Sequence, residues 1–377
     1  MMNNLFKRGL LVAGCLLITT GCWDQRLFKD AQLVLSVGMD TTENGQINTT
    51  TSVPYIEKGE QGPGKESIQI VSAVANTPRE TRTKIDQKIP NRIDPSKMKV
   101  LVLGSTLAEQ KIYPVLDVFY REPKSNLNAM LAVAEGSAEG IISMKAKDVP
   151  RVSEYISGLL EGAEDSSIIP EQNIQLVCAE IFDPGQDFLL PLLDINEEEA
   201  LIYLKGVAIF NDQVYTGESL TPDEGTLYQL MSGKKGEMAR MTKQISEDRE
   251  PKILNYITVD VIDVNSQINI EVSEDQAITV NLDTNLEVRA VEYPKDQLSS
   301  NKEIKKLNEA LTKSLTEQAN EIIKKLQEAN SDPLGIGRRM IAFHHDTWKT
   351  MDWKDIYPTI TFNPKVKVKV IQHGIIE

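Results

Sequence analysis

The stretch ITVDVIDVNSQINIEVSEDQAITVNLDTNLEV, residues 257–288, carries the clearest periodicity in the chain. Apolar and polar side chains alternate in three segments of it, which are Ile257–Val264, Ile268–Val272 and Ile278–Val288. Alternation of this kind places one face of a strand on a core and the other face in water. Polar residues near Ser266 and Glu274 separate the segments and predict turns. The stretch therefore predicts an antiparallel meander with one wet face.

A long helix is predicted directly after this meander. Ser300 and Glu303 have the S-x-x-E spacing of a capping box, which marks the start of a helix. Apolar residues then recur at helical spacing as Ile304, Leu307, Leu311, Leu315, Ile322 and Leu326. They form one apolar stripe, so we expect the helix to lie across the meander and cover it.

The chain beyond this helix predicts a second helix and a final strand. Asp332-Pro333 ends the long helix, and Pro333 suits the first position of a helix that runs to about Lys349. Valines at 366, 368 and 370 alternate with lysines at 365, 367 and 369. This alternation predicts a strand buried on one side, with the lysines protecting the edge of a sheet from aggregation.

Large aromatic residues cluster after the second helix. Trp348 and Trp353 lie close together in the sequence, and Tyr357 follows them. Aromatic side chains of this size dominate the burial of cores and of interfaces. We predict that they anchor the core of the C-terminal sheet, and a partner-binding surface is the alternative.

The first half of the chain mixes short strands with helices. The predicted strands are Ala31–Gly38, Asn48–Tyr55, Met98–Gly104 and Leu127–Ala134, and the predicted helices are Pro78–Ile89 and Thr106–Tyr120. Such a succession is typical of an α/β or α+β domain. Asp183-Pro184-Gly185 and the acidic run at 194–199 then mark a seam, which a hairpin at 202–216 and a polar stretch at 233–250 follow.

These observations predict a multi-domain α+β protein with mixed or antiparallel sheets and flanking helices. We expect an N-terminal α+β domain at 22–195, a middle hairpin domain and linker at 196–250, and a C-terminal domain at 251–377. In the last of these, the antiparallel meander is covered by the long helix.

Residues 1–21 have the layout of a lipoprotein signal peptide. Lys7 and Arg8 precede an uncharged, mostly apolar run from Gly9 to Thr20, which is too short to span a bilayer. Cleavage before Cys15 would leave only about five residues between the charges and the cysteine, short of the roughly 7 to 15 that a signal needs. Cleavage before Cys22 leaves a full apolar run, so we predict that Cys22 becomes the lipidated N-terminus; an ordinary secretory signal is the alternative.

Composition limits the classes of partner. The chain has 377 residues, 41% hydrophobic content, a mean hydropathy of -0.27 and a net charge of -14. Removal of Lys7 and Arg8 with the signal, which holds no acidic residue, lowers the charge to -16. Such an acidic body repels nucleic acid and anionic lipid headgroups, so we expect no nucleic-acid partner and assign membrane attachment to the N-terminal lipid alone.

The cysteine and histidine residues predict no catalytic or metal site. With Cys15 removed and Cys22 lipidated, Cys178 has no disulfide partner and is predicted to be a small buried apolar residue. His344 and His345 are adjacent, so on a helix their imidazoles point about 100 degrees apart and do not chelate one ion. A thiol nucleophile needs a nearby base, and every histidine is far from Cys178 in the sequence.

One segment approaches a phosphate-binding loop without completing it. Gly59 and Gly64-Lys65 have the spacing of that motif, but Glu66 stands where a magnesium-binding hydroxyl is required. Pro63 also removes a backbone donor from the loop. No G-x-S-x-G motif occurs either. We therefore predict no cofactor, no metal and no enzymatic activity.

Several short motifs together resemble a known family, the Ger(x)C lipoproteins, which are the C subunits of spore germinant receptors. The motifs are Gly21-Cys22-Trp23-Asp24, a strand ending Val37-Gly38-Met39-Asp40, Gly206 to Phe210, Asp332-Pro333-Leu334-Gly335-Ile336-Gly337, the pair Trp348 and Trp353, and a Val/Lys strand ending at Gly374. Each motif is weak alone, and their order over the mature chain makes the resemblance specific. Thr19 departs from it, since the family lipobox usually has an aliphatic residue there.

The resemblance implies a lipid-anchored protein on the outer face of the inner spore membrane. It implies integral-membrane A and B subunits as partners and a role in the nutrient-triggered germination response, with no catalytic residues. Only Cys22 transfers as a site. The alternative function is a solute-binding lipoprotein of a nutrient transporter, which predicts two lobes of βαβ units around a cleft.

Overall fold

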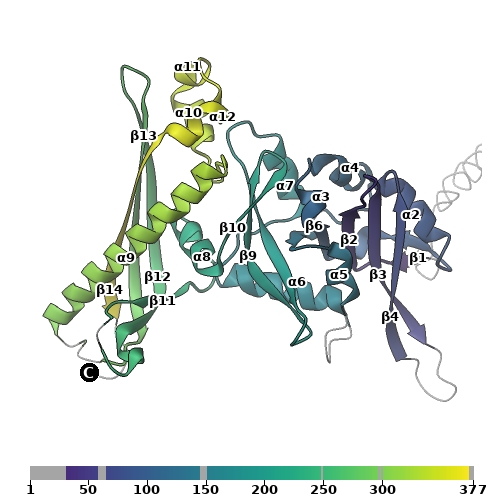
Figure 1. Cartoon of the computed structure of the whole chain (residues 1–377), viewed down its shortest axis with the longest axis horizontal. Helices are drawn as coiled ribbons and strands as arrows, with labels where there is room; N and C mark the ends of the chain where they lie inside the picture. Colours follow the sequence, from purple (N-terminus) through teal and green to yellow (C-terminus); the bar gives the residue numbers. More distant parts are fainter. Residues whose placement is uncertain are drawn as a thin grey trace, which may run out of the picture.

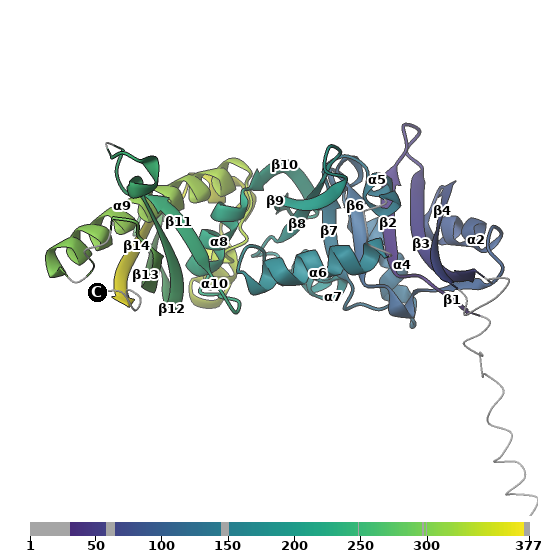
Figure 2. The same ribbon diagram turned by 90° about the horizontal axis from the view of Figure 1, so that it is seen from below.

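The computed structural model describes residues 31–57, 65–144, 151–247, 249–295, 298 and 300–372. Three features of the sequence lie outside these residues: the predicted signal peptide with Cys22, the glycine-rich loop at 58–64, and His373. The body is elongated, with a large sheet toward one end and a smaller sheet at the other (Figures 1 and 2). The α+β fold class is confirmed.

The large sheet has eight strands and mixed direction. In spatial order they are β10 (Val214–Leu220), β9 (Leu201–Asn211), β8 (Leu189–Asn196), β7 (Met130–Ala134), β6 (Val100–Gly104), β2 (Ser36–Thr41), β3 (Ile47–Glu57) and β4 (Lys65–Ala75). The four central strands, β8 to β2, run parallel, and the two outer strands at each end pair antiparallel. A two-stranded parallel sheet, β1 (Ala31–Leu33) with β5 (Arg92–Asp94), lies beside it.

Helices cover both faces of the large sheet, which explains why β6 and β7 at its centre are apolar throughout. Strand β6 is buried along its whole length. One face packs against α2 (Pro78–Asp86), α4 (Tyr113–Arg121) and α7 (Ile174–Ile181). The other face packs against α5 (Ala138–Ser143), α6 (Val152–Asp165) and α8 (Pro222–Met231). The predicted helix at 106–120 is divided into α3 (Ser105–Ala108) and α4.

The predicted hairpin at 202–216 forms as β9 and β10, with Asp212 in the turn at a φ of 57. It does not stand apart, however, because β9 pairs with β8 along the edge of the large sheet. The proposed boundary between 195 and 196 therefore falls at the end of β8, within its pairing with β9. The polar stretch at 233–250 also contains a strand, β11 (Arg240–Gln244). The division of the mature chain into three domains stays a prediction.

The small sheet has the order β11, β12 (Tyr256–Val272), β13 (Ile278–Glu292) and β14 (Thr361–Gln372). The turn predicted near Glu274 is present, but the one near Ser266 is wrong, because β12 is a single 17-residue strand. Ser266 pairs with Thr284 inside the ladder, and its hydroxyl donates to the Met231 carbonyl at 2.5 Å. A polar residue with such partners interrupts the apolar alternation without ending the strand.

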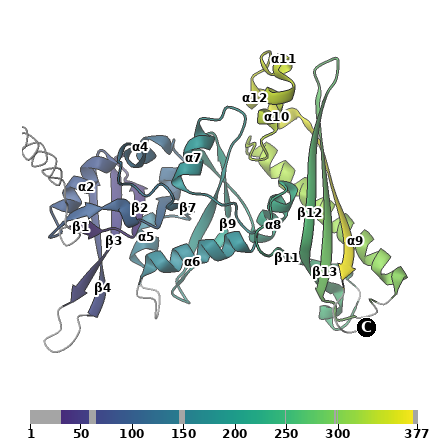
Figure 3. The ribbon, with the colours of Figure 1, turned by 180° about the vertical axis from the view of Figure 1, so that it is seen from behind.

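The last strand differs from the predicted antiparallel arrangement, because β14 runs parallel to β13. The segment between them holds α9 (Asn301–Glu328), α10 (Ile336–Phe343), α11 (His345–Trp348) and α12 (Trp353–Ile356). A long helical connection of this kind is what parallel pairing requires. The small sheet is therefore mixed, with a long helix across it, as Figure 3 shows from behind.

Helix α9 covers the small sheet as predicted. Its buried residues follow the predicted stripe and are Leu307, Leu311, Leu315, Ala319, Ile322, Ile323 and Leu326. The helix starts after Ser300, but the predicted capping box is wrong because the Ser300 side chain makes no cap hydrogen bond. Glu303 instead accepts from Tyr293 at 2.8 Å and from Lys295 at 2.5 Å. The hydrogen bond from Tyr293 and the ion pair with Lys295 therefore take the place of the capping box at Glu303.

The outer edge of β14 is protected by α9 as well as by its lysines. The backbone N–H groups of Val366, Val368 and Val370 donate to Thr316, Thr312 and Asn308 at 3.1, 3.0 and 2.9 Å. An unpaired strand edge is a template for aggregation. Polar side chains of the helix thus satisfy the edge donors, while the three valines are buried against the core.

Candidate functional site: a pocket at the junction of the two sheets

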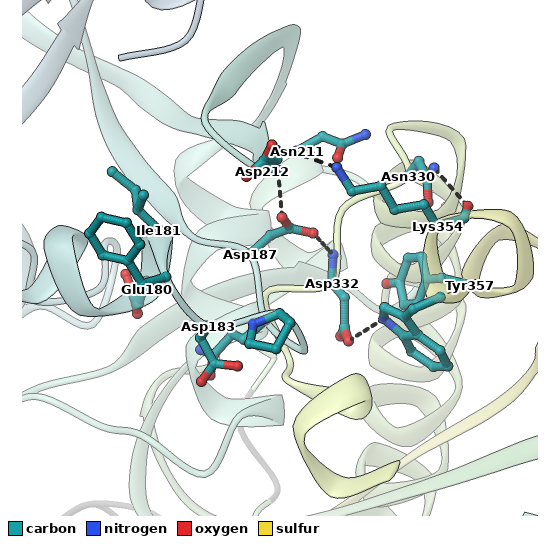
Figure 4. Close-up of a pocket in the computed structure, with 14 residues that line it drawn as sticks. Glu180, Ile181, Asp183, Asp187, Asn211, Asp212, Asn330, Asp332, Lys354 and Tyr357 are labelled. Atoms are coloured by element: carbon teal, nitrogen blue, oxygen red, sulfur yellow. Dashed lines mark hydrogen bonds and ion pairs between the residues drawn. The ribbon is translucent and has the colours of Figure 1, made fainter. Parts of the chain in front are cut away.

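A cavity of about 290 Å³ opens where the large sheet meets the helical segment before β14. Residues within 180–187 and 211–212 line one side of it, and residues within 330–332 and 353–357 line the other (Figure 4). We call this cavity the junction pocket. Its walls come from segments distant in the sequence, so its geometry depends on how the two sheets are joined.

Asp332 is the central side chain of the junction. It is 2% exposed and accepts hydrogen bonds from the backbone N–H groups of Ile336 and Gly337 at 3.0 and 2.7 Å. Its second oxygen also accepts from the indole nitrogen of Trp353 at 3.2 Å. These bonds fix the start of α10, which begins at Ile336 instead of at the predicted Pro333. Burial raises the pKa of Asp332 to about 8, against the lowering effect of the two backbone donors.

Asp187 connects the large sheet to this turn. Its carboxylate accepts from the backbone N–H of Asp332 at 2.8 Å and from that of Asp212 at 2.6 Å. Its own backbone N–H donates to the Asp332 carbonyl at 3.1 Å. Burial raises the pKa of Asp187, while the two donated hydrogen bonds oppose that rise. One carboxyl group therefore joins the segment just before β8, the β9–β10 turn and the segment after α9.

Two glycines allow the backbones to meet at this point. A Cβ on Gly337 would lie 2.8 Å from the Trp353 indole nitrogen and 2.9 Å from the backbone of Gly185. A Cβ on Gly185 would lie 2.5 Å from the backbone nitrogen of Arg338. Gly335 adopts a φ of 66, in the left-handed region that favours glycine. In the Asp332–Gly337 motif, Gly335 thus permits the turn and Gly337 permits the close approach to Gly185 and Trp353.

Charged groups surround the mouth of the pocket. Arg338 lies 3.1 Å from Asp183, and Lys354 lies 3.6 Å from Asp212. Glu180 accepts from the amide of Gln172 at 2.9 Å, and burial raises its pKa. Among the described residues, the pocket lining holds five acidic side chains and one lysine.

The aromatic cluster predicted to anchor the C-terminal sheet does so at this junction. Trp353 is 9% exposed and Tyr357 is 1% exposed, which confirms them as core residues. The rings of Trp348, Trp353, Tyr357 and Phe362 contact one another in sequence, with centroids 5.5, 5.7 and 6.0 Å apart. Trp348 is half-buried.

The other short motifs also have structural roles. A Cβ on Gly38 would lie 3.0 Å from the Ala138 carbonyl, and Asp40 accepts from the backbone N–H of Ala138 at 2.8 Å. In the Gly206–Phe210 motif, a Cβ on Gly206 would lie 2.1 Å from the Leu220 carbonyl. Each motif marks a close approach of two backbones or the cap of a helix.

The remaining predicted sites are not brought together. Cys22 lies outside the described residues. Cys178 is half-buried, less than predicted, and lies beside the Tyr120 hydroxyl. Within the ranges that the structure describes, no three metal-binding side chains gather, and no helix is long and apolar enough to cross a membrane.

Sequence reasoning missed the junction pocket itself. Asp332 was visible in a motif and Asp183–Gly185 as a seam, but nothing in the sequence pairs Asp187 with Asp332. At the junction, N–H groups of the fold donate to the side chains of Asp187 and Asp332, and acidic residues line a small cavity.

Comparison with known proteins agrees with the motifs. The model of the spore germination protein N-terminal domain matches residues 24–195, and the spore germination B3/GerAC-like C-terminal model matches residues 205–374. Spore germination protein GerQC of Bacillus cereus is 22% identical, with 98% of this chain and 100% of that protein covered. Spore germination protein KC of Bacillus subtilis (strain 168) is 21% identical, with 95% of this chain and 93% of that protein covered.

A solved structure shares the fold. The crystal structure of the GerBC protein superimposes with a TM-score of 0.59 at 17% identity, over 89% of this chain and 96% of that one. The two family models together span nearly all of the chain after residue 23. The chain therefore belongs to the Ger(x)C family of spore germinant receptor C subunits.

Proposed function

We propose that this chain is a membrane-tethered lipoprotein subunit of a spore germinant receptor, with a lipid on Cys22. It docks with the integral-membrane A and B subunits on the outer face of the inner spore membrane, and the nutrient-triggered germination response requires it. The observation that carries the proposal is the match of both family models, which accounts for both halves of the chain.

The position of β1, the first described strand, supports the tether. Strand β1 lies at the end of the body that is far from the small sheet (Figure 2). Ala31 lies nine positions after Cys22, and a fully extended chain of nine steps reaches about 30 Å. A lipid on Cys22 would hold the large-sheet end of the body near the membrane, where membrane-embedded subunits are accessible.

We propose a scaffolding role without catalysis. The carboxylates of the junction accept hydrogen bonds from backbone and indole donors, which suits a structural role. A solute-binding lipoprotein would instead have two lobes of βαβ units. In the described residues, the small sheet contains two antiparallel pairs and one parallel pair, an arrangement that does not repeat the large sheet.

Gene deletion and a single substitution test this proposal. In a strain that lacks other nutrient receptors, deletion of this gene with the A and B genes intact should abolish the response to the nutrient of this receptor. Cys22→Ala should move the protein from the membrane fraction to the soluble fraction, because the lipid is the proposed anchor. Cys178→Ala is the matched control and should leave fractionation unchanged.

Two outcomes would contradict the proposal. An unchanged germination response after deletion would remove the receptor role. Membrane attachment that persists in Cys22→Ala, with the precursor processed normally, would remove the lipid tether and leave the receptor role to be judged by the deletion.

A further inference from the structure

The second half of β12 has a free outer edge. Strand β11 pairs only with Tyr256–Asp260 at the start of β12, and Ser266 contacts the end of α8. Residues 267–272 pair with β13 on one side, and on their other side the described part of the chain places no strand. Figure 3 shows this part of the β12–β13 hairpin extending past β11. We call the outer edge of residues 267–272 the open edge; it is as long as an average strand.

The open edge lacks the protection that β14 and β4 have. The edge of β14 is covered by side chains of α9. On β4, the last strand of the large sheet, Lys84 and Lys88 donate to the carbonyls of Val74 and Ser72 at 2.9 and 2.6 Å. The open edge has the sequence QINIEV, without the lysine or proline that commonly blocks an edge. It is therefore suited to pairing with an added strand.

The apolar face of the open edge is incompletely covered. Three of its side chains lie directly opposite three of β13, and the pairs are Ile268 with Leu282, Ile270 with Val280, and Val272 with Ile278. The β13 members are at most 4% exposed, whereas the β12 members are only partly buried. A strand added beside β12 would cover these side chains on the side where they lack a neighbour.

On the wet face of the small sheet, a row of polar side chains ends at the open edge. The Asn363 amide of β14 donates to the side-chain oxygen of Asn281 at 3.0 Å. The Asn281 amide donates in turn to a carboxylate oxygen of Glu271 at 3.0 Å. Glu271 is exposed, and the ion pairs among the described residues do not include it. The row thus ends in a carboxylate that can accept from a cation on a further strand.

The other edge of the same sheet indicates which chemistry complements this carboxylate. Strand β14 alternates buried valines with lysines, and its Lys369 lies 3.0 Å from Glu287 of β13. Opposite charges on neighbouring strands stabilise their pairing. A second copy of β12 would bring no cation to Glu271, because residues 256–272 contain no lysine or arginine. Charge complementarity therefore favours a basic partner over self-association.

We propose that the open edge binds an extended segment of a partner protein in which apolar residues alternate with lysine or arginine. The backbone of that segment pairs with β12, and its apolar side chains lie against Ile268 and Ile270. One of its basic side chains forms an ion pair with Glu271. This surface is independent of the proposed lipid on Cys22, so peptide binding and membrane attachment are tested separately.

The test measures hydrogen–deuterium exchange of the mature protein with the blocked peptide KVKVKV. This peptide should slow exchange severalfold at residues 267–272, because strand pairing protects edge amides, and it should leave 361–372 unchanged. The peptide EVEVEV has the opposite charge and should give no protection. The peptide KKKVVV has the same composition without the alternation, so it controls for general attraction to an acidic protein and should also give none.

Variants of Glu271 test the ion pair through the anisotropy of fluorescein-labelled KVKVKV. Glu271→Gln should weaken binding about twofold to fivefold, the range for an exposed ion pair. Glu271→Lys should weaken it further, since it places like charges opposite each other. Glu274→Gln alters an exposed carboxylate of the adjoining turn and should leave the affinity unchanged.

Four outcomes would overturn the proposal. The first is no protection of residues 267–272 by KVKVKV, and the second is equal protection by KVKVKV and KKKVVV. The third is equal affinity for KVKVKV in the wild type, Glu271→Gln and Glu271→Lys. The fourth is protection of 267–272 that rises with protein concentration in the absence of peptide, because it would assign the open edge to a second copy of this chain.

Discussion

Replacement of Asp332 by asparagine should change how stability depends on pH. The folded pKa of Asp332 is raised to about 8 from its ordinary value of 3.8, with burial as the main cause. A carboxyl group whose pKa is raised by folding contributes stability that is full below its unfolded pKa and is lost as pH rises through its folded pKa. Between about pH 4 and pH 8 the folded wild type retains one proton that the unfolded chain has released.

The magnitude follows from that proton and from the local hydrogen bonds. The free energy of unfolding of the wild type should fall by up to about 1.4 kcal/mol per pH unit through this group alone. The Asp332→Asn variant has no such slope, but the amide nitrogen that it introduces cannot accept, so one or two of the donors at Ile336, Gly337 and Trp353 lose a partner. At about pH 5 the variant should therefore be less stable by about 1 to 2 kcal/mol.

The assay is urea unfolding of both proteins at half-unit steps from about pH 5 to pH 8, the window below the folded pKa. The deficit of Asp332→Asn should shrink as pH rises, and it should vanish or change sign toward the upper end of that window. Asp187 and Glu180 contribute to both proteins, so the difference between the two curves isolates Asp332 to first order. Asp263→Asn, at an exposed position, should show no pH-dependent difference. A constant deficit across this range would refute the reasoning, because it would mean that Asp332 is ionised in the folded protein throughout.

Two further predictions concern packing. Gly337→Ala should lower the free energy of unfolding by about 1 to 3 kcal/mol, because its Cβ would lie 2.8 Å from the Trp353 indole nitrogen; Gly158→Ala, in α6 with open space around it, should be neutral or stabilising. Leu315→Ala should cost about 2 to 5 kcal/mol since Leu315 is fully buried in α9, whereas Lys313→Ala, at a side chain that is 78% exposed, should have little effect. Both pairs are measured by denaturant unfolding, and equal losses within either pair would contradict the packing described here.

The junction joins the two sheets into one body. The Ser331 hydroxyl donates to the Phe210 carbonyl at 2.5 Å, and Tyr228 donates to the Pro333 carbonyl at 2.9 Å. Lys325 of α9 lies 2.7 Å from Glu224 of α8. A single apolar core runs from the large sheet through α8 to the small sheet. Under the proposed tether, the position of the membrane-proximal end would therefore set the position of the distal sheet.

Local patterns predicted much of the secondary structure. The alternation in β13, the stripe of α9 and the Val/Lys strand β14 are determined by neighbours one to four residues apart, and all three form. Errors arose where a long-range partner changed the local preference. Ser266 continues β12 because Thr284 and Met231 bond it, and Ser300 makes no box because Tyr293 and Lys295 hold Glu303.

The sequence by itself determined the α+β class, the covered C-terminal sheet, the family motifs and Cys22 as the expected lipid site. These features depend on periodicity and on short motifs, which the chain carries locally. Only the tertiary structure decided that the hairpin extends the large sheet, that β14 is parallel, and that Asp187, Asp332 and Tyr357 meet in one acidic pocket. The physical reason is that burial and hydrogen bonding between residues far apart in the chain, such as Asp187 and Asp332 at a separation of 145, set those features, and no local pattern encodes such a pairing.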